Sequence, residues 1–391
     1  MTAWCRLKPN NNCLADIVFD AGGEATKLLK RVSQMRRIHF VLALAGVAAS
    51  DIEFISAAGA TAQARRLTPA LDADALVSSA NNNEIPKSPG GIASPVVLTR
   101  AALSLIPHKT TIVDCGSFVS PSTDHIKAGR QPSRLDGAAH VDALNSAEIK
   151  LLYQAGLDLA EKLSAEEIVV LAECVPGGTT TAQATFMALG IDAEHLLSSS
   201  LVENNHAQKI ALAALAVANA AARRNLNGSN NHSSSVENRI AHFKAAPLDA
   251  IAAVGDPMQA FAVALVSARA ACGAITVLAG GSQMLAVYAL AAQVASNQNG
   301  KLSDTLVATT KWVARDTTAD TAALAQLLGA PYVASGLSLS KSQHSGLRAY
   351  EEGHVKEGVG AGAALLLASV MAMIDEQTLL TTIDSFYSVL T

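Results

Sequence analysis

The stretch that decides the fold is Glu166-Glu167-Ile168-Val169-Val170-Leu171-Ala172-Glu173-Cys174-Val175-Pro176-Gly177-Gly178-Thr179-Thr180-Thr181. Its apolar run at 168–172 is typical of a parallel strand that is buried on both faces. Gly177 and Gly178 then turn the chain into a helix that begins with three threonines. The stretch therefore predicts a strand–loop–helix unit of an α/β protein.

Strand–loop–helix units of this kind recur along the chain. Strands are predicted at 40–44, 111–115, 168–172, 250–254, 275–278, 306–309 and 332–334, and helices at 146–163, 180–189 and 257–272. Gly190 is expected to end one helix, and Asp256-Pro257 to begin another. The alternation predicts a doubly wound, Rossmann-like parallel sheet of about six strands. Loops with glycines at 177–178, 255 and 280–281 follow predicted strands, so we expect them to converge on one crevice.

The composition of the 391 residues is that of a globular protein with a sizeable core. Half of the chain is hydrophobic, 16% is charged, and the net charge is −4. No Lys/Arg stripe interleaves with aromatic residues, which argues against a nucleic-acid partner. The five cysteines are odd in number and lack C-x-x-C spacing, so a reduced, cytoplasmic setting is expected.

Residues 270–300 carry no charge and are numerous enough to span a membrane. However, Gly280-Gly281-Ser282-Gln283 interrupts the run in its middle. The part before this turn is typical of a strand and the part after it of a helix, so a buried strand–helix pair is the preferred interpretation. The shorter apolar run at 359–374 predicts a buried helix, and no membrane segment is expected.

The domain organisation is predicted from the strand–helix alternation between residues 111 and 334, which is flanked by less regular ends. Residues 38–345 are expected to form the α/β nucleotide-binding core, and residues 1–37 with 346–391 a smaller helical lobe that completes the active site. The Asn- and Ser-rich segment 225–238 predicts an exposed linker or insertion. A second loop region is expected at 78–91, which contains Asn81, Asn82 and Asn83.

Two glycine turns are candidate ligand sites. Gly177-Gly178-Thr179-Thr180 offers amides and hydroxyls at a helix N-terminus, which is typical of an anion site. The turn lacks the lysine of a P-loop and the G-x-G-x-x-G of a dinucleotide site. The residues leave two roles for this turn: binding of a phosphate, or capping of the helix by Thr179. Gly280-Gly281-Ser282 either contacts a ligand or allows close packing of strand against helix.

The sharpest candidate for chemistry is Glu357, which precedes a helix whose first turn is Gly358-Val359-Gly360-Ala361. A carboxylate there is either a favourable charge at a helix N-terminus, worth about 0.3–1 kcal/mol, or a positioned base. Lys341 is either solvated or faces an anionic group. No cluster of His, Cys and Asp has metal-ligand spacing, so no metal site is expected.

These residues resemble the nicotinate mononucleotide:dimethylbenzimidazole phosphoribosyltransferase family, in the branch found in archaea and cyanobacteria. The resemblance lies in Glu173 with 177–181 and in Glu357 with 358–361, and segments 255–259, 278–286 and 346–353 look like that branch. It runs from about residue 38 to 370. In the better-studied bacterial pattern the threonines follow the motif Gly-x-Gly-Asn. This chain departs from that motif at Val175, Pro176 and Gly178.

The resemblance implies a cytoplasmic, homodimeric glycosyltransferase without a cofactor. Its reaction would move the phosphoribosyl group of nicotinate mononucleotide onto a benzimidazole-type base, giving an α-ribazole phosphate for cobalamin synthesis. Glu357 would be the base, and Glu173 would orient the ribose or assist it, with capping or a salt bridge as its alternative. Residues 177–180, 280–282 and Lys341 would bind substrate. The alternative is a non-catalytic nucleotide-binding or regulatory protein of the same fold, and the acceptor base stays open.

Overall fold

The computed structural model describes residues 5–6, 14–78, 85–136, 141–203, 205–226 and 235–390. Most of the insertion expected at 225–238 lies outside the described residues, as do Asn81, Asn82 and Asn83 of the second loop region. Most of the first 13 residues also lie outside them.

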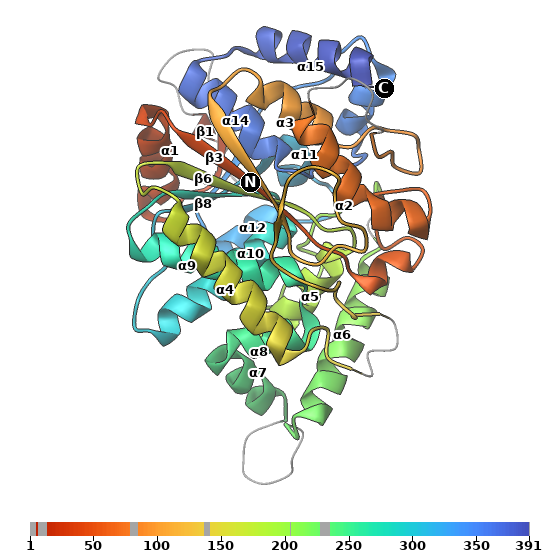
Figure 1. The fold of residues 1–391 in the computed structure, drawn as a ribbon, viewed down its shortest axis with the longest axis vertical. Coiled ribbons are helices and arrows are strands. Elements are labelled where there is room, and N and C mark those ends of the chain that lie inside the picture. Colours follow the sequence, from red (N-terminus) through yellow and green to blue (C-terminus); the bar gives the residue numbers. More distant parts are fainter. Residues whose placement is uncertain are drawn as a thin grey trace.

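Within the described ranges a nine-stranded sheet forms the centre of the molecule (Figure 1). Its order is β1-β2-β9-β8-β7-β6-β3-β4-β5. The strands are β1 Cys5–Arg6, β2 Ala15–Phe19, β3 Ile38–Leu44, β4 His108–Asp114, β5 Ile126–Lys127, β6 Ile168–Cys174, β7 Thr276–Ala279, β8 Thr305–Thr310 and β9 Tyr332–Ser335. The seven strands from β9 to β5 are parallel, whereas β1 and β2 form an antiparallel edge.

The chain winds outward from the middle of the sheet in both directions. It passes from β3 to β4 and β5 on one side, returns to β6 beside β3, and then continues to β7, β8 and β9 on the other side. The strand order thus reverses between β3 and β6. The predicted doubly wound parallel sheet is confirmed, with more strands than expected.

Alternating side chains of the strands build a core on each face of the sheet. In β3, Phe40, Leu42 and Leu44 belong to one hydrophobic cluster, while Val41 and Ala43 belong to the other. The helices on the side of Phe40, Leu42 and Leu44, the first side of the sheet, are α1 Glu24–Gln34, α2 Ala62–Val77, α3 Val96–Leu103, α14 Ala361–Ala372 and α15 Glu376–Leu390. The helices on the second side of the sheet are α4 Ser146–Lys162, α5 Gly178–Ala188, α6 His206–Arg223, α8 Pro247–Val254, α9 Pro257–Ala271, α10 Ser282–Asn297 and α12 Thr321–Leu328 (Figure 1).

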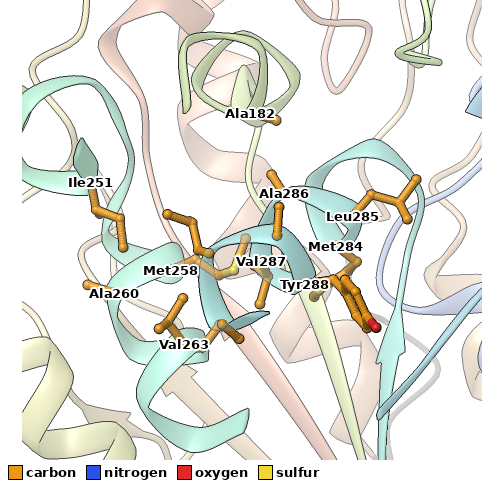
Figure 2. Packing of buried hydrophobic residues seen from close by; sticks show 14 of the residues in the cluster. Ala182, Ile251, Met258, Ala260, Val263, Met284, Leu285, Ala286, Val287 and Tyr288 are labelled. Carbon is orange, nitrogen blue, oxygen red and sulfur yellow. The ribbon is translucent and has the colours of Figure 1, made fainter. Parts of the chain in front are cut away.

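The second core fixes the start of α10, which matters for the site described below. Met258 and Val263 of α9 lie close to Met284 and Val287 of α10, all of them fully buried (Figure 2). Helix α10 also packs against α5. The N-termini of two helices on this side of the sheet are therefore held in a rigid, close-packed setting.

One predicted strand is wrong. Residues 250–254 lie in helix α8 and not in a strand. A short apolar run fits a buried strand and a buried helix equally well, and here Pro247 at the first helical position selects the helix. The remaining predicted strands and helices are present within a few residues, and Gly190 and Asp256-Pro257 mark helix ends as expected. Strand β2 was not anticipated.

The uncharged run at 270–300 forms β7 and α10, and the run at 359–374 contains the buried helix α14. No helix among the described residues is long and apolar enough to cross a membrane. The N-terminal segment adds β2 to the sheet, and α1 packs against α14. The division of the chain into a core and a terminal lobe stays a prediction.

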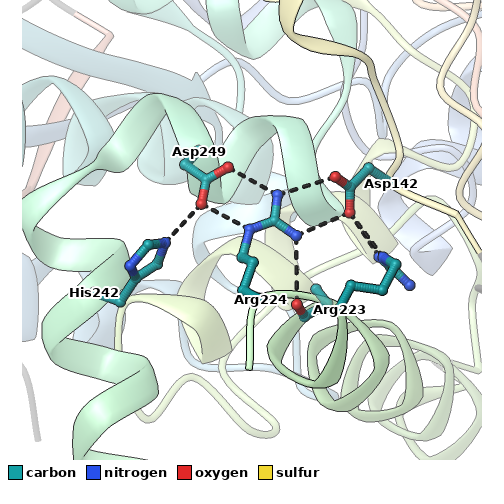
Figure 3. A network of polar contacts seen from close by, with 6 residues as sticks. Asp142, Arg223, Arg224, His242 and Asp249 are labelled. Atoms are coloured by element: carbon teal, nitrogen blue, oxygen red, sulfur yellow. Dashed lines mark hydrogen bonds and ion pairs between the residues drawn. The ribbon is translucent and has the colours of Figure 1, made fainter. Parts of the chain in front are cut away.

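The remaining elements are short or lie at the periphery: α7 Ser235–Ala245, α11 Lys311–Ala314, α13 Ser345–Arg348, and the 3-10 helices η1 Ala21–Gly23, η2 Ala48–Asp51 and η3 Ala349–Glu352. An ion network fastens α6, α7 and α8 together (Figure 3). Arg224 contacts Asp249 at 2.7 Å and Asp142 at 2.9 Å, and His242 lies 2.7 Å from Asp249.

Candidate functional site

A pocket opens beyond the carboxyl ends of the parallel strands, beside the point where the strand order reverses. It has an empty volume of about 910 Å³, part of which is open to solvent. Its walls come from residues 173–177 at the end of β6 and in the turn that follows, from 281–283 at the start of α10, from the loop 355–358 and from 55–58 after β3. In a doubly wound sheet this is where a ligand is expected to bind.

The first glycine turn forms one wall of the pocket. Gly177 has φ +85° and precedes α5, a left-handed conformation that favours glycine. Gly177 and Thr179 line the pocket, while Gly178 and Thr180 are not among its described lining residues. A Cβ atom on Gly178 would lie 1.8 Å from Oε1 of Gln283, and Thr180 is fully buried. The turn therefore presents a helix N-terminus, which favours an anion.

The second glycine turn lies beside the first. Gly281 and Ser282 line the pocket, and the Ser282 hydroxyl donates to the carbonyl of Ser198 at 2.9 Å. Gly280 is not among the described lining residues, because it packs against α10, where a Cβ would lie 2.9 Å from Met284 Cγ. Lys341 is exposed on a turn after β9 and is likewise not among the described lining residues.

Glu357 lies partly buried in the pocket wall between β8 and the start of α14. Its carboxylate accepts hydrogen bonds from the backbone N–H groups of Thr310 at 2.8 Å, Gly358 at 3.1 Å and Gly362 at 3.3 Å, and from the Thr309 hydroxyl at 3.2 Å. Burial raises the pKa of Glu357 to about 7, although these hydrogen bonds favour the charged form. A group with such a pKa suits general-base work near neutral pH.

The backbone around Glu357 is strained. Val355, Lys356 and Val359 have φ values of +63°, +61° and +53°. For residues other than glycine such conformations cost about 1–3 kcal/mol each and cluster at functional sites. The Val359 N–H donates to the carbonyl of Glu173 at 3.0 Å, so the two glutamate-bearing segments are directly joined.

A buried ion pair holds the same loop. The Lys356 Nζ lies 2.6 Å from Asp316 Oδ2, and both side chains are 3% exposed. Lys356 also donates to the Leu201 carbonyl at 3.0 Å, and Asp316 accepts from the Ser198 hydroxyl at 2.6 Å. Burial alone would raise the pKa of Asp316, but the hydrogen bonds from Lys356 and Ser198 outweigh it and lower the pKa. This pair ties the Glu357 loop to residues 198–201.

Glu173 ends β6 inside the pocket and is 6% exposed. Its Oε2 accepts a hydrogen bond from the Val175 N–H at 3.0 Å, which stabilises the turn. Burial and the negative charges of Glu357, Asp256 and Asp72 together raise its pKa to about 8. Both carboxyl groups therefore titrate near neutral pH, and the charge of Glu357 disfavours ionisation of Glu173. Neighbouring carboxyl groups of unequal pKa are typical of sites that assign an acid and a base.

The structure thus brings together Glu357, Glu173, the turn at 177–179 and the turn at 281–282. It adds residues that sequence reasoning missed: Lys356, the serines at 198–200, and Asp72 of α2. Lys356 directly precedes the candidate base Glu357 in the sequence, and this position could have identified it as a residue of the site. Asp72 lies inside a helix without any motif. Among the described residues no group of three or more His, Cys, Asp or Glu could hold a metal ion.

Comparison with solved structures supports the architecture. The chain superposes on CobT from Thermus thermophilus with a TM-score of 0.57 and 19% identity, over 91% of this chain and 92% of that one. A nicotinate-nucleotide-dimethylbenzimidazole phosphoribosyltransferase from the same organism gives a TM-score of 0.53 and 18% identity, with the same coverage. At this level of identity the likeness shows a shared fold.

Comparison of sequences gives more similar relatives. The UPF0284 protein SSO2213 of Saccharolobus solfataricus is 35% identical over 352 residues, which cover 89% of this chain and 92% of that protein. The UPF0284 protein glr4139 of Gloeobacter violaceus is 38% identical over 354 residues, covering 90% and 88%. No family model matches the chain. With such identities over most of both sequences, this chain belongs to the UPF0284 family.

Proposed function

We propose that the protein moves the phosphoribosyl group of nicotinate mononucleotide onto a lower-ligand base of the benzimidazole type, with release of nicotinate. The product is an α-ribazole phosphate for cobalamin synthesis. The observation that carries this proposal is the Glu357 carboxyl group, which is fixed by backbone N–H groups in a pocket that also contains the N-terminus of α5. The likeness in fold to CobT supports it by analogy.

The proposed chemistry assigns a role to each wall of the pocket. The turn at 177–179 and the start of α5 hold the nucleotide phosphate, because a helix N-terminus attracts anions. A ring nitrogen of the acceptor forms a bond to the anomeric carbon while the bond to nicotinate breaks. The other ring nitrogen then loses its proton to Glu357, whose charge also stabilises the cation that develops on the ring. Attack from the side opposite nicotinate converts the β-nucleotide into an α-linked product.

Glu173 is assigned a supporting role in this reaction. Burial raises its pKa to about 8, so in its protonated form the carboxyl group donates a hydrogen bond to a ribose hydroxyl. A homodimer, a cytoplasmic location and the lack of a cofactor or nucleic-acid partner remain parts of the proposal. The serines at 198–200 and the turn at 281–282 complete the wall beside the phosphate.

Replacing Glu357 by glutamine tests the proposal. The variant Glu357→Gln keeps size and shape but accepts no proton, so the single-turnover rate of nicotinate release should fall by about 10²–10⁴-fold. Nucleotide affinity, measured by calorimetry, should change little. The exposed Glu352 serves as a matched control, because Glu352→Gln lies five residues away outside the described pocket wall.

A non-catalytic nucleotide-binding protein of the same fold predicts a different result. In that protein the carboxylate of Glu357 only caps α14, since one of the N–H groups it binds, that of Gly362, lies in the first turn of that helix. Its loss would lower stability by about 1 kcal/mol, and the wild-type protein would release no nicotinate with any base. If the Glu357→Gln variant released nicotinate at the wild-type rate, the protein would still be an enzyme, but Glu357 would not be its base.

A further inference from the structure

Asp72 of α2 is a buried acid that the proposed chemistry does not use. Its side chain lines the pocket and is 2% exposed. Oδ2 accepts a hydrogen bond from the Cys174 thiol at 3.2 Å, whereas Oδ1 accepts none from any residue that the structure describes. A buried acceptor without a partner is costly, and such groups in native proteins call for an explanation.

The wall around Asp72 includes both apolar and polar side chains. The lining residues from segments 55–58 and 86–95 and from α2 combine the apolar Ile55, Ala57, Ala58, Pro86, Ile92 and Pro95 with the polar Thr68, Lys87 and serines at 56, 88 and 94. Burial in this setting raises the pKa of Asp72 to about 7, while Ser94 and Cys174 favour its charged form. Both the neutral and the ionised carboxyl group have an oxygen that can accept a hydrogen bond. Apolar side chains with one free acceptor among them fit an aromatic ring that carries one polar hydrogen on its edge.

The positions of Asp72 and Glu357 define the two ends of the space for such a ring. Glu357 is bound at the end of β8, through Thr309 and Thr310, and Asp72 at the end of β6, through Cys174. Strand β7 lies between them, so two strand spacings of about 4.8 Å place the groups on the order of 10 Å apart. Hydrogen bonds of about 2.8 Å at both ends leave room for a small fused ring. Glu173, whose pKa both acids raise, lies near both.

We propose that Asp72 selects an acceptor ring that bears a hydroxyl or amino group on the edge remote from the attacking nitrogen. This inference rests on the proposed function and names the substrate class of that site. A ring with an apolar remote edge, such as 5,6-dimethylbenzimidazole, leaves Oδ1 unpaired. A site built to hydrogen-bond a hydroxyl or amino group rejects the analogue that lacks it far more strongly than an apolar pocket distinguishes methyl groups.

The test compares 5-hydroxybenzimidazole with 5,6-dimethylbenzimidazole on the full-length protein. Binding of each base is measured by calorimetry with nicotinate mononucleotide present, and kcat/KM is measured by nicotinate release. The wild-type protein should favour the hydroxylated base by at least about tenfold in both measurements. Asp72→Leu should abolish or invert this preference, because the remote edge then meets an apolar side chain, while nucleotide affinity stays unchanged.

Two further variants keep the test decisive. Asp72→Asn keeps an acceptor oxygen and should retain part of the preference for the hydroxylated base. This variant replaces Asp72→Leu in the test if the leucine variant fails to fold. Asp74→Asn is the matched control on the same helix, because Asp74 accepts from the backbone N–H groups of Thr123 and Ser122 outside the pocket. It should leave the preference intact.

The outcomes separate this inference from the proposed function. Equal affinity of the wild-type protein for the two bases, or an unchanged preference in Asp72→Leu, would overturn the role of Asp72. Release of nicotinate in the same experiments would still support the proposed transferase activity. Selective binding of the hydroxylated base that depends on Asp72, without any nicotinate release, would support the role of Asp72 and refute the transferase.

Discussion

At the scale of single residues, four carboxyl groups with raised pKa values gather in the pocket wall and directly behind it. Asp72, Glu173 and Glu357 line the pocket, and the fully buried Asp256 is near enough for its charge to act on Glu173. Burial raises the pKa values of Asp72, Glu173, Asp256 and Glu357 to about 7, 8, 6 and 7, respectively. Their ordinary values are 3.8 for Asp and 4.5 for Glu. Such a concentration of perturbed acids around one crevice is typical of a functional site.

This cluster predicts how stability depends on pH. Because each pKa is higher in the folded chain, the native state binds more protons than the unfolded state between about pH 4 and 8. The stabilising contribution is complete below the ordinary pKa values and is lost as the pH rises through 6 to 8. The melting temperature should therefore fall as the pH is raised from about 5 to about 7, since the four carboxyl groups outnumber His39 and His206, whose pKa values burial lowers. Above that range Lys209 opposes the fall, because burial lowers its pKa to about 7.

Thermal melts at a series of pH values measure this effect. Glu173→Gln should flatten the slope, because each proton retained by the native state contributes up to about 1.4 kcal/mol per pH unit. The exposed Glu352 is the control position, where Gln should leave the slope unchanged. A melting temperature that rises over this range would show that the acids are paired more strongly than their surroundings indicate.

The residues that the sequence identified and those it missed differ in a physical way. Glu173 and Glu357 were predictable because each stands next to glycines at a junction between a strand or loop and a helix. Asp72 and Asp316 were not, because their neighbours along the chain carry no comparable signal. Asp316 meets Lys356 across 40 residues of sequence, and only the packing of separate elements creates that pair.

At the scale of elements, strands were predictable where the apolar run was bounded by an acid or by glycine. Strands β6 and β7 are examples, and both are followed by the expected helices α5 and α10. The run at 250–254 was misleading because five apolar residues carry no period that separates strand from helix. Strand β2 was missed because it pairs with β9 in the antiparallel direction, at the edge of the sheet and outside the parallel strands that the strand–helix alternation predicted.

The contact between α5 and α10 carries a prediction at this scale. In Gly178→Val the new side chain would displace Gln283, whose Oε1 lies 1.8 Å from a Cβ at position 178. Gln283 lines the pocket, so its displacement should weaken nucleotide binding by about tenfold, as judged by calorimetry, because the three added carbon atoms disturb a close-packed wall. The fold should persist, since the obstacle is the end of a flexible side chain.

A second substitution distinguishes the cause. The single variant Gln283→Ala is the reference, because it removes the displaced side chain without changing the turn. If displacement of Gln283 is the whole cause, Gly178→Ala combined with Gln283→Ala should bind nucleotide as strongly as Gln283→Ala alone. Weaker binding by the double variant would show that the turn at 177–178 contacts the nucleotide directly, through backbone that only glycine leaves accessible.

At the scale of the whole molecule, the position of the site follows from the topology. The strand order reverses between β3 and β6, and the carboxyl ends there carry the loops that form the pocket. This much was predictable from the alternation of strands and helices. The contribution of α2 to the pocket was not, because α2 follows a long irregular segment after β3 and reaches the site only through tertiary packing.

The last prediction concerns assembly. Helix α6 buries one face against α5 and α8, while its opposite face exposes a stripe of small residues with Leu215, which is 43% exposed. The stripe consists of Ala207, Ala211, Ala214, Ala218 and Ala222. Small side chains at this spacing allow two helices to approach closely, and an apolar stripe of this kind is favoured where two copies meet.

We therefore expect light scattering at micromolar concentration to give twice the chain mass of 40.2 kDa. Leu215→Glu places a charge in the middle of the stripe and should produce monomers, because an unpaired charge in an apolar interface is strongly unfavourable. Leu327→Glu is the matched control: Leu327 is 57% exposed on α12, away from the stripe, and its replacement should leave the dimer intact. A wild-type protein of 40.2 kDa would rule out the dimer, whereas a dimer that persists in Leu215→Glu would place the contact on another face.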